Sequence, residues 1–385
     1  MSKKIAIIEL DYHVECVNTL CKVFLDSPHS IIFYTKLDIY SELIKDKRFL
    51  QYEWRILRHK ESVKDFILNF QDEINTCDVV FFDTLASNFK FFSEISFLPK
   101  TIVRIHNTNT YLNPLKNLWI KLSFFYLFKD FSHFFRETIL NLDWYYRAKC
   151  IQKFDYLCFP DQTITDFVLQ NKLIDASKVC QPIPLTVNDP IFFKSKPTDK
   201  EFYFTVPGSI DKRRKDYTVL YNAFKNAIPL FKTRVVLTLA GKPKGRYGDN
   251  IIKKFKELES DFFHLQTFEN RVSQSQFNLV MKQTDCIIAP ILKYAKYTLY
   301  KEVYGQTKIS GSMSDIIQYG KPGIFPDTYP ISIVYKGVIK QYTSVDDLTN
   351  LVLNQVSLRI GLSEEDFKPN SIENTLKSIE QAFFS

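Results

Sequence analysis

Short apolar runs alternate with stretches of helical periodicity along the first half of this chain. The apolar runs predict strands at 4–10, 31–35, 52–57, 78–83, 101–106 and 154–159. The amphipathic stretches predict helices at 14–25, 37–45, 63–74 and 163–170. Strands that alternate with helices in this way are typical of a parallel sheet covered by helices on both faces.

A second alternation follows segment 181–200, which contains four prolines and has no helical period. There we predict strands at 202–206, 235–240, 263–268, 286–290 and 323–325, and helices at 215–227, 249–258, 273–282 and 371–384. The expected fold class is α/β, with two doubly wound Rossmann-like domains facing a cleft. The domains are expected at 1–185 and 200–360, with the C-terminal helix in 361–385 packing back across the hinge.

A polar loop at 307–311 leads into a short amphipathic helix. We predict Ser312 as its N-cap, with Asp315 three residues further on as the reciprocal partner of a capping box. Gly320 ends this helix and Pro322 prevents its continuation. A helix N-terminus after a Gly-containing loop suits a phosphate, although an ordinary capped helix fits the same pattern.

Residues 115–149 interrupt the alternation with a long aromatic stretch of helical character. Its most apolar part, 118–128, is too short to span a bilayer and is flanked by Lys116, Lys121 and Lys129. Such a helix can lie in a membrane interface, so we name residues 115–130 as a candidate membrane contact. The alternative is a helix that covers the sheet or lies in the core.

Composition narrows the classes of protein that remain. The chain has 385 residues, 45% hydrophobic and 24% charged, with no secretory signal and no apolar run long enough to span a bilayer. We expect a cytoplasmic protein, either free or peripheral on the inner face of the cell membrane. Its seven cysteines are scattered without metal-like spacing, which predicts reduced, buried thiols and no metal site.

The charge and the glycine pattern bear on the ligand. A formal net charge of +8 fits nucleic acid, anionic lipid or a phosphorylated ligand. Because no nucleic-acid motif accompanies the basic residues, we expect no nucleic-acid partner. The chain has neither a Walker phosphate loop nor a G-x-G-x-x-G fingerprint, which argues against a nicotinamide or flavin enzyme.

Polar residues at the ends of predicted strands are the candidate site of the first domain. They are Glu9, Asp11 and His13 after the first strand, Asp83 after the fourth, and His106 and Asn107 after the fifth. Ligands of parallel sheets bind beyond the carboxyl ends of the strands. For each residue, a cap or an internally bonded loop position remains the alternative; Asp11 in particular can cap the first helix.

The second domain carries a basic loop after its first strand. Gly208 makes the turn, and Arg213, Arg214 and Lys215 are expected at the mouth of the next helix. Cations gathered at a helix N-terminus oppose the helix dipole, which favours an anion held between them. A simply solvated basic loop is the alternative.

Four motifs in this half of the chain occur in a recognisable order. They are Pro207-Gly208-Ser209-Ile210 with the helix of Asn222-Ala223-Phe224, then 237–242, then Val272-Ser273 with 284–290, and finally 314–324. Their order resembles the nucleotide-binding half of GT-B-fold glycosyltransferases, especially the family-4-like group. The resemblance covers about residues 200–330, and 154–184 resembles more weakly the end of their acceptor domain.

The resemblance implies roles for the donor-side residues. Lys215, with Arg214 beside it, matches the lysine that neutralises the donor diphosphate, whereas Ser209 stands where the family has an arginine. Asp315 matches the second acidic residue of the E-x7-E pattern, a ribose-hydroxyl ligand, but Thr307 replaces the first glutamate. This departure favours Ser310, Gly311 and Ser312 as the diphosphate cradle. The loop of Arg271 and Val272 matches the one that meets the nucleotide base.

The resemblance also implies a function. We expect a metal-independent, cofactor-free hexosyltransferase that uses a nucleotide-diphosphate sugar, with UDP-sugar favoured over GDP-sugar, in bacterial-type surface polysaccharide or glycan assembly. The acceptor would be a glycan or a lipid-linked molecule bound by the first domain, near Glu9, Asp83, His106 and Asn107. If the reaction inverts, Asp11 or His13 is the expected base. A GT-B-type nucleotide-sugar epimerase and a non-catalytic two-lobed sugar- or phosphate-binding protein remain as alternatives.

Overall fold

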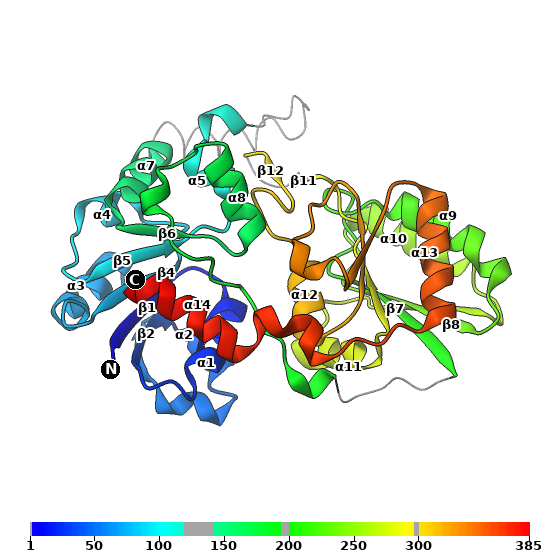
Figure 1. Cartoon of the computed structure of the whole chain (residues 1–385), viewed down its shortest axis with the longest axis horizontal. Helices are drawn as coiled ribbons and strands as arrows, with labels where there is room; N and C mark the ends of the chain where they lie inside the picture. The colour runs from blue at the N-terminus through cyan, green and yellow to red at the C-terminus, as the bar shows by residue number, and fades with distance from the viewer. Residues whose placement is uncertain (1, 119–141, 194–199, 296–299) are drawn as a thin grey trace. The chain divides into compact units, whose positions relative to one another are not determined.

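The structure is a computed structural model, and it describes residues 2–118, 142–193, 200–295 and 300–385. The chain divides into two compact units, shown in Figure 1. The first unit comprises Met1–Val187, Thr298–Glu302 and Ile372–Ser385, and the second comprises Asn188–Tyr297 and Val303–Ser371. Each unit is described by itself below.

The first unit is built on a parallel six-stranded sheet with the strand order β3-β2-β1-β4-β5-β6. Its strands are β1 (Lys4–Glu9), β2 (Ser30–Lys36), β3 (Glu53–Leu57), β4 (Val79–Thr84), β5 (Lys100–Arg104) and β6 (Tyr156–Cys158). Five of the six residues of β1 and all residues of β4 are buried, as expected for central strands with helices on both faces.

The helices of the first unit include every helix predicted there and some shorter ones. They are α1 (Val14–Phe24), α2 (Leu37–Leu43), α3 (Val63–Ile74), α4 (Phe89–Glu94), α5 (Thr108–Leu112), α7 (Asp143–Lys153), α8 (Gln162–Gln170) and α14 (Ile372–Phe384), with 3-10 turns at Lys47–Gln51, Leu115–Asn117 and Ala176–Lys178. Helix α14, red in Figure 1, lies beside α1. Its Ile379, Ala382 and Phe383 are buried in the same core as β1 and β2.

The second unit repeats the architecture with the strand order β14-β13-β10-β7-β8-β9, again all parallel. Its strands are β7 (Glu201–Pro207), β8 (Arg234–Ala240), β9 (Phe263–Thr267), β10 (Cys286–Ile288), β13 (Gly323–Pro326) and β14 (Ile339–Tyr342). A separate two-stranded sheet joins β11 (Tyr294–Ala295) to β12 (Glu302–Val303). The prediction of two doubly wound α/β sheets is confirmed.

The helices of the second unit follow its strands in the expected alternation. They are α9 (Tyr217–Ala227), α10 (Gly245–Lys256), α11 (Gln274–Gln283), α12 (Gly311–Tyr319) and α13 (Val345–Leu358), with 3-10 turns at Pro190–Phe192, Ile228–Leu230, Ile333–Tyr335 and Glu364–Asn370. The sequence did not predict β14 or α13. Helix α13 packs against α9 and completes one face of the core.

Three predicted helix starts in this unit are wrong. Helix α10 begins at Gly245, four residues before the predicted start at 249. Helix α12 begins at Gly311, and its N-cap is Ser310, whose Oγ accepts a hydrogen bond of 3.2 Å from the backbone N–H of Ser312. Helix α9 begins at Tyr217 with Asp216 as N-cap, so Lys215 precedes the helix instead of opening it. The predicted end of α12 is confirmed, because Gly320 has a left-handed φ of 60°.

Most of the candidate membrane contact, residues 119–130, lies outside the described residues. Leu118 is described and pairs with Tyr300 in an isolated antiparallel bridge within the first unit. Among the described residues, no helix has both the length and the apolar character needed to cross a membrane.

Candidate functional site

The predicted acceptor-side residues of the first unit lie together where the central strands of its sheet end. We call this place the histidine edge, after His13 and His106. β1, β4 and β5 are neighbours in the sheet, and Glu9, Asp83 and His106 lie at or just beyond their carboxyl ends. His106 Nε2 lies 2.9 Å from the backbone oxygen of Asp83 and 3.2 Å from Thr84 Oγ1. The imidazole of His13 stacks on that of His106, with the ring centroids 4.5 Å apart and the planes 8° from parallel.

Beneath these histidines lies a buried charge network. Asp83 and Arg104 are fully buried and form an ion pair of 3.1 Å. Burial raises the pKa of Asp83, while the positive charge of Arg104 opposes that rise. Burial and then the charge of Asp83 raise the pKa of Glu9 to about 7, so Glu9 holds a proton for part of the time at neutral pH.

Backbone geometry fixes Glu9 in this network. Its Oε1 accepts hydrogen bonds from the backbone N–H groups of Asp11 at 2.9 Å and Tyr12 at 3.0 Å. These bonds hold the turn that carries the chain from β1 to His13. Glu9 is therefore a support of the turn as well as part of the charge network.

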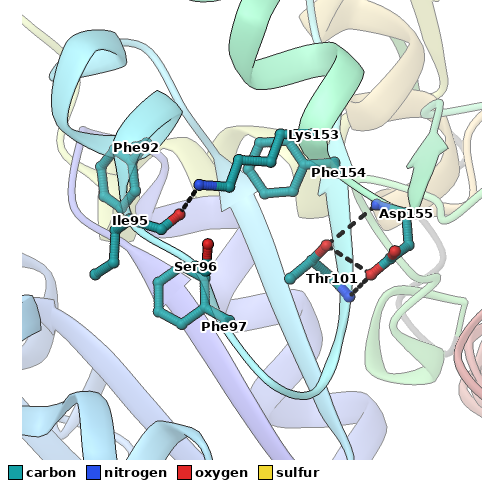
Figure 2. Close-up of a pocket in the computed structure, with 8 residues that line it drawn as sticks. All are labelled: Phe92, Ile95, Ser96, Phe97, Thr101, Lys153, Phe154 and Asp155. Carbon is teal, nitrogen blue, oxygen red and sulfur yellow. Dashed lines mark hydrogen bonds between the residues drawn. The ribbon is translucent and has the colours of Figure 1, made fainter.

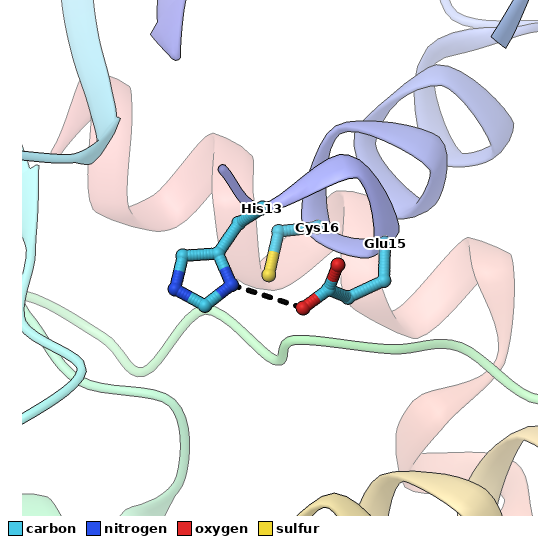
Figure 3. Close-up of side chains that lie close together, drawn as sticks. All are labelled: His13, Glu15 and Cys16. Atoms are coloured by element: carbon cyan, nitrogen blue, oxygen red, sulfur yellow. Dashed lines mark hydrogen bonds and ion pairs between the residues drawn. The ribbon is translucent and has the colours of Figure 1, made fainter. Parts of the chain in front are cut away.

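His13 is the group of this cluster best suited to proton transfer. It is half-buried before the first turn of α1, and its Nδ1 lies 2.9 Å from Oε1 of the exposed Glu15, as Figure 3 shows. Burial lowers the pKa of His13, but the hydrogen bond and charge of Glu15 and the charges of Glu9 and Asp83 outweigh that effect. The net result is a pKa raised above its usual value of 6.5.

The other candidate base, Asp11, is engaged in holding a loop. Its two carboxylate oxygens accept from the backbone N–H of Ala86 at 2.7 Å and from Ser87 Oγ at 2.9 Å. Asp11 also does not cap α1, because the N-cap position belongs to His13. Asn107 is the N-cap residue of the short helix α5 but makes no side-chain capping bond.

Two groups of potential metal ligands overlap at this edge, although the sequence predicted no metal site. The ligand atoms of His13, Glu15 and Cys16 lie within 4.8 Å of one another, as do those of Cys16, Asp83 and His106. Arg104 already balances the charge of Asp83. Because nearly parallel stacked rings cannot both direct a nitrogen at one ion, the two groups do not combine into one site that uses both histidines.

Of the donor-side residues of the second unit, Gly208, Ser209 and Lys215 lie at the carboxyl end of β7, beside the end of β8. Gly208 has a φ of +82°, and a Cβ at Gly241 would lie 2.4 Å from the backbone of Gly208. The two strand ends therefore approach as closely as only glycine permits. Backbone pairing of Arg214 with Leu292 at 2.9 Å and of Asp216 with Pro290 at 2.7 Å holds the basic loop against the chain after β10.

Lys215 departs from the expectation of an exposed loop residue. Its side chain is buried, and its Nζ donates to the backbone oxygens of Pro207 and Gly208, at 3.3 Å for the latter. Burial lowers the pKa of Lys215 to about 8, although the charge of Asp315 works in the opposite direction. Burial raises the pKa of Asp315 to about 7, and the charge of Lys215 opposes that rise.

Helix α12 carries Asp315 on its second turn, and its N-terminus belongs to the same unit as Lys215. Ser310 and Ser312 are buried, whereas Gly311 is exposed with no atom within 4 Å of where its Cβ would lie. Thr307, at the position of the missing glutamate, is fully buried, and its Oγ1 accepts a hydrogen bond of 2.7 Å from the backbone N–H of Val303. Thr307 thus stabilises the loop that contains it.

The remaining donor-side candidates differ in their surroundings. Arg213 forms an ion pair of 2.7 Å with Asp211, so part of its charge is already balanced, and Arg214 is exposed. Ser209 follows Gly208 in the strand-end turn. Arg271 and Val272 lie in the loop between β9 and α11, and no described contact joins them to Lys215 or Asp315.

A separate cavity of about 220 Å³ lies in the first unit, and Figure 2 shows its lining. Three of its eight lining residues are phenylalanines, and the polar ones are internally bonded: Thr101 to Asp155 at 2.8 Å and Lys153 to the backbone oxygen of Ile95. Thr101 is near the start of β5, whereas His106 follows the end of that strand. The cavity therefore lies away from the histidine edge.

Three contributors to the histidine edge were missed by sequence reasoning. Arg104 could have been found, because a charged residue inside the apolar run 101–106 signals a buried ion pair. Glu15 and Cys16 gave no such signal. They reach the cluster only because the turn after β1 and the start of α1 bring them beside His13 and Asp83.

Comparison with known proteins gives the fold its context. No family profile matches the chain, and no curated protein matches it significantly. A glycosyltransferase from Rickettsia africae ESF-5 is 12% identical, covering 99% of this chain and 98% of that chain with a TM-score of 0.61. Anabaena Alr3699/HepE, solved with UDP and glucose, is 10% identical, covering 100% of both chains with a TM-score of 0.60. The chain has the GT-B fold.

The GT-B fold is shared by enzymes with different reactions. A UDP-N-acetylglucosamine 2-epimerase is also similar, with 10% identity, 100% of this chain and 96% of that chain covered, and a TM-score of 0.50. At such identities the similarity concerns the fold alone. The function has to be argued from the residues of this chain.

Proposed function

We propose that this protein is a glycosyltransferase that moves a hexose from a nucleotide-diphosphate sugar to a glycan or lipid-linked acceptor. The observation that carries the proposal is the buried Lys215 at the carboxyl end of β7, electrostatically coupled to Asp315 on α12. Asp315 compensates the buried ammonium group only in part, because its pKa of about 7 leaves it partly protonated at neutral pH, so a second anion would be stabilised there. A diphosphate supplies that anion where the ends of parallel strands bind ligands.

The donor side uses groups of the second unit. Lys215 and the exposed Arg214 would neutralise the diphosphate, and the start of α12 at Ser310, Gly311 and Ser312 would add the positive end of a helix dipole. Asp315 would accept a hydrogen bond from a ribose hydroxyl. We favour a UDP-sugar as donor, which is consistent with the UDP found in the HepE complex.

The acceptor side would use the histidine edge of the first unit, with His13 as the base. His13 combines partial exposure with an acidic partner, whereas the carboxylate of Asp11 is held by Ala86 and Ser87. A base that removes the acceptor proton fits attack opposite the leaving group, which inverts the sugar. NMR of the product's anomeric configuration tests this step, and retention would refute the base assignment.

Transfer requires that the leaving nucleotide diphosphate be stabilised as the bond to the sugar breaks. Lys215, Arg214 and the α12 dipole would provide fixed positive charge for that purpose without a resident cofactor. The acceptor hydroxyl would lose its proton to His13 as its oxygen bonds to the anomeric carbon. We further propose surface polysaccharide or glycan assembly as the setting of the reaction.

The deciding experiment incubates the protein with UDP-, GDP-, dTDP- and ADP-sugars and measures release of the nucleotide diphosphate with and without glycan or lipid-linked acceptors. A transferase releases UDP only when acceptor is present, or much faster then. The epimerase-like neighbour makes the second candidate specific. An epimerase would convert UDP-N-acetylglucosamine without any acceptor, and that result would replace the proposal.

A further inference from the structure

The segment that follows α8 returns along the edge strand β6. Leu157 and Val179 form an isolated parallel bridge. The backbone N–H of Cys180 donates to the oxygen of Leu157 at 3.0 Å, and that of Ile183 donates to the oxygen of Phe159 at 3.0 Å. In parallel pairing a residue bonds to the carbonyl one position before its opposite neighbour, so Cys180 lies directly opposite Cys158.

Opposite residues of paired strands project their side chains to the same face of the sheet. Here each thiol shifts the pKa of the other, and Cys180 Sγ lies 3.4 Å from the backbone oxygen of Leu157, the residue before Cys158. Paired strands are about 4.8 Å apart. That spacing lies inside the range of about 4.4–6.8 Å between the Cα atoms of residues joined by a disulfide.

We propose that Cys158 and Cys180 form a redox-active thiol pair, in which Cys180 reacts first with a hydroperoxide and Cys158 then closes a disulfide. Cys180 is the one cysteine of the chain that is not buried, whereas Cys158 is fully buried behind it. An oxidant therefore meets Cys180 first. The resolving cysteine already lies opposite Cys180 in the strand pairing, so the second step needs no change of register.

The electrostatic surroundings of the two sulfurs support the order of attack. The hydrogen bond from Cys158 and then the nearby positive charge of Lys100 lower the pKa of Cys180, although burial opposes them. Burial raises the pKa of the thiols of Cys16, Cys21, Cys77, Cys150 and Cys286. Because the thiolate is the reactive form, Cys180 is set apart from these thiols.

The reaction balances with a hydroperoxide as the two-electron oxidant. The Cys180 thiolate attacks one peroxide oxygen, the O–O bond breaks, and a sulfenic acid forms with release of hydroxide or alkoxide. The Cys158 sulfur loses its proton and attacks the Cys180 sulfur, forming the S–S bond and breaking the S–O bond. With hydrogen peroxide, two thiols become one disulfide and two waters are released.

The test exposes the full-length protein to graded hydrogen peroxide, alkylates the remaining thiols with N-ethylmaleimide, and maps unreduced peptides by mass spectrometry. We expect Cys158 and Cys180 to lose alkylation together and to appear as one cross-linked peptide pair. Dithiothreitol should restore both thiols. The other five of the seven cysteines should remain alkylatable at the same peroxide concentration after denaturation.

Matched variants separate the roles of the two sulfurs. Cys180→Ser should leave Cys158 reduced, whereas Cys158→Ser should leave a sulfenic acid at Cys180 that dimedone traps. Cys77→Ser, at a buried cysteine elsewhere in the same unit, should form the cross-link like the parent protein. If Cys158→Ser does not fold, comparison of Cys180→Ser with the parent protein still shows whether oxidation of Cys158 requires Cys180.

Three results would overturn the inference. They are overoxidation of Cys180 while Cys158 stays alkylatable, equal reaction of all seven cysteines, and no reaction of either member of the pair before the protein unfolds. Thermal melts before and after peroxide distinguish the last case from oxidation of a denatured chain.

Discussion

At the scale of the residue, Lys215 shows how burial changes the use of a common side chain. A lysine in a basic loop ordinarily stays in water, but this one turns inward to the backbone oxygens of Pro207 and Gly208. An alanine at this position would leave a cavity, so it would mix lost charge with lost packing. Methionine keeps most of the apolar stem and removes the charge together with the hydrogen bonds to those two backbone oxygens.

Lys215→Met should therefore weaken binding of UDP, and thermal melts measure separately the cost of the two lost hydrogen bonds to the backbone. A charge-assisted hydrogen bond is typically worth about 1.5–3 kcal/mol, which predicts a loss of roughly 10- to 150-fold in affinity. Isothermal titration calorimetry measures the affinity of each variant for UDP. Lys212→Met makes the same change at an exposed neighbour and should have a much smaller effect. Equal affinities for both variants would remove Lys215 from the donor site.

The pH dependence of the same binding follows from the pKa of about 8 for Lys215. As the pH rises through that value, Lys215 loses its proton and its attraction for the diphosphate. The affinity for UDP should fall between about pH 7 and pH 9 in the parent protein. Lys215→Met should show a smaller fall, because only the charge gained by Asp315, whose pKa is about 7, then weakens binding in this range; a flat profile in the parent protein would contradict the assignment.

His13 gives a second pH prediction, on the rate. A base acts when neutral, so turnover should rise with pH through the pKa of His13, which lies above 6.5. Glu15→Gln removes the charge that favours protonated His13 while keeping a hydrogen-bond acceptor, and it should move the acid limb of kcat/KM to lower pH. Glu94→Gln, an exposed control in the same unit, should leave the limb in place. If the acid limb of kcat/KM does not move in Glu15→Gln, Glu15 does not influence the pKa of the base.

At the scale of the element, α12 shows where sequence patterns stop being decisive. Ser310 and Ser312 are both plausible caps, and the pattern of Ser312 with Asp315 favoured the wrong one. The end of the same helix was predictable, because Gly320 adopts a left-handed conformation that few other residues accept. The local sequence thus predicts where α12 ends, whereas the position where it begins depends on how the preceding loop is buried.

The same distinction explains which other elements can be predicted from the sequence and which cannot. The strands of both sheets apart from β14 were predictable because buried parallel strands are continuous apolar runs; β14 lies at the edge of its sheet, and its two middle residues are exposed. The short helices α4 and α5 span too few turns to show a period. The burial of Lys215 depends on pairing between Arg214 and Leu292, which are distant in sequence, so no local pattern reveals it.

Gly311 allows the role of the α12 start to be tested. Gly311→Asp places a negative charge at the first residue of the helix, where the dipole should stabilise it by about 0.3–1 kcal/mol. The same charge should repel a bound diphosphate. We therefore expect an unchanged or higher melting temperature together with weaker UDP binding. Gly311→Asn has nearly the same shape without the charge and should bind more tightly than Gly311→Asp; equal binding would place the diphosphate elsewhere.

At the scale of the whole molecule, the first unit is assembled from both ends of the chain. Ile379, Ala382 and Phe383 of α14 belong to the same core as residues of β1 and β2. The rings of Phe383 and Phe81 have centroids 5.2 Å apart, and His29 Nε2 lies 3.0 Å from Glu380 Oε1. The first unit is thus completed by a helix that follows the second unit in sequence.

Phe383→Ala tests this arrangement. Removing a buried phenylalanine costs about 3–5 kcal/mol, and the loss should fall on the first unit. All three tryptophans, Trp54, Trp119 and Trp144, belong to that unit, so urea unfolding followed by tryptophan fluorescence reports on it. Gln381→Ala, at an exposed position of α14, should change the free energy of unfolding by less than about 0.5 kcal/mol. Under native conditions Phe383→Ala should still bind UDP normally, because the proposed donor groups all lie in the second unit. A fluorescence transition no lower than that of Gln381→Ala would show that α14 is not part of the core.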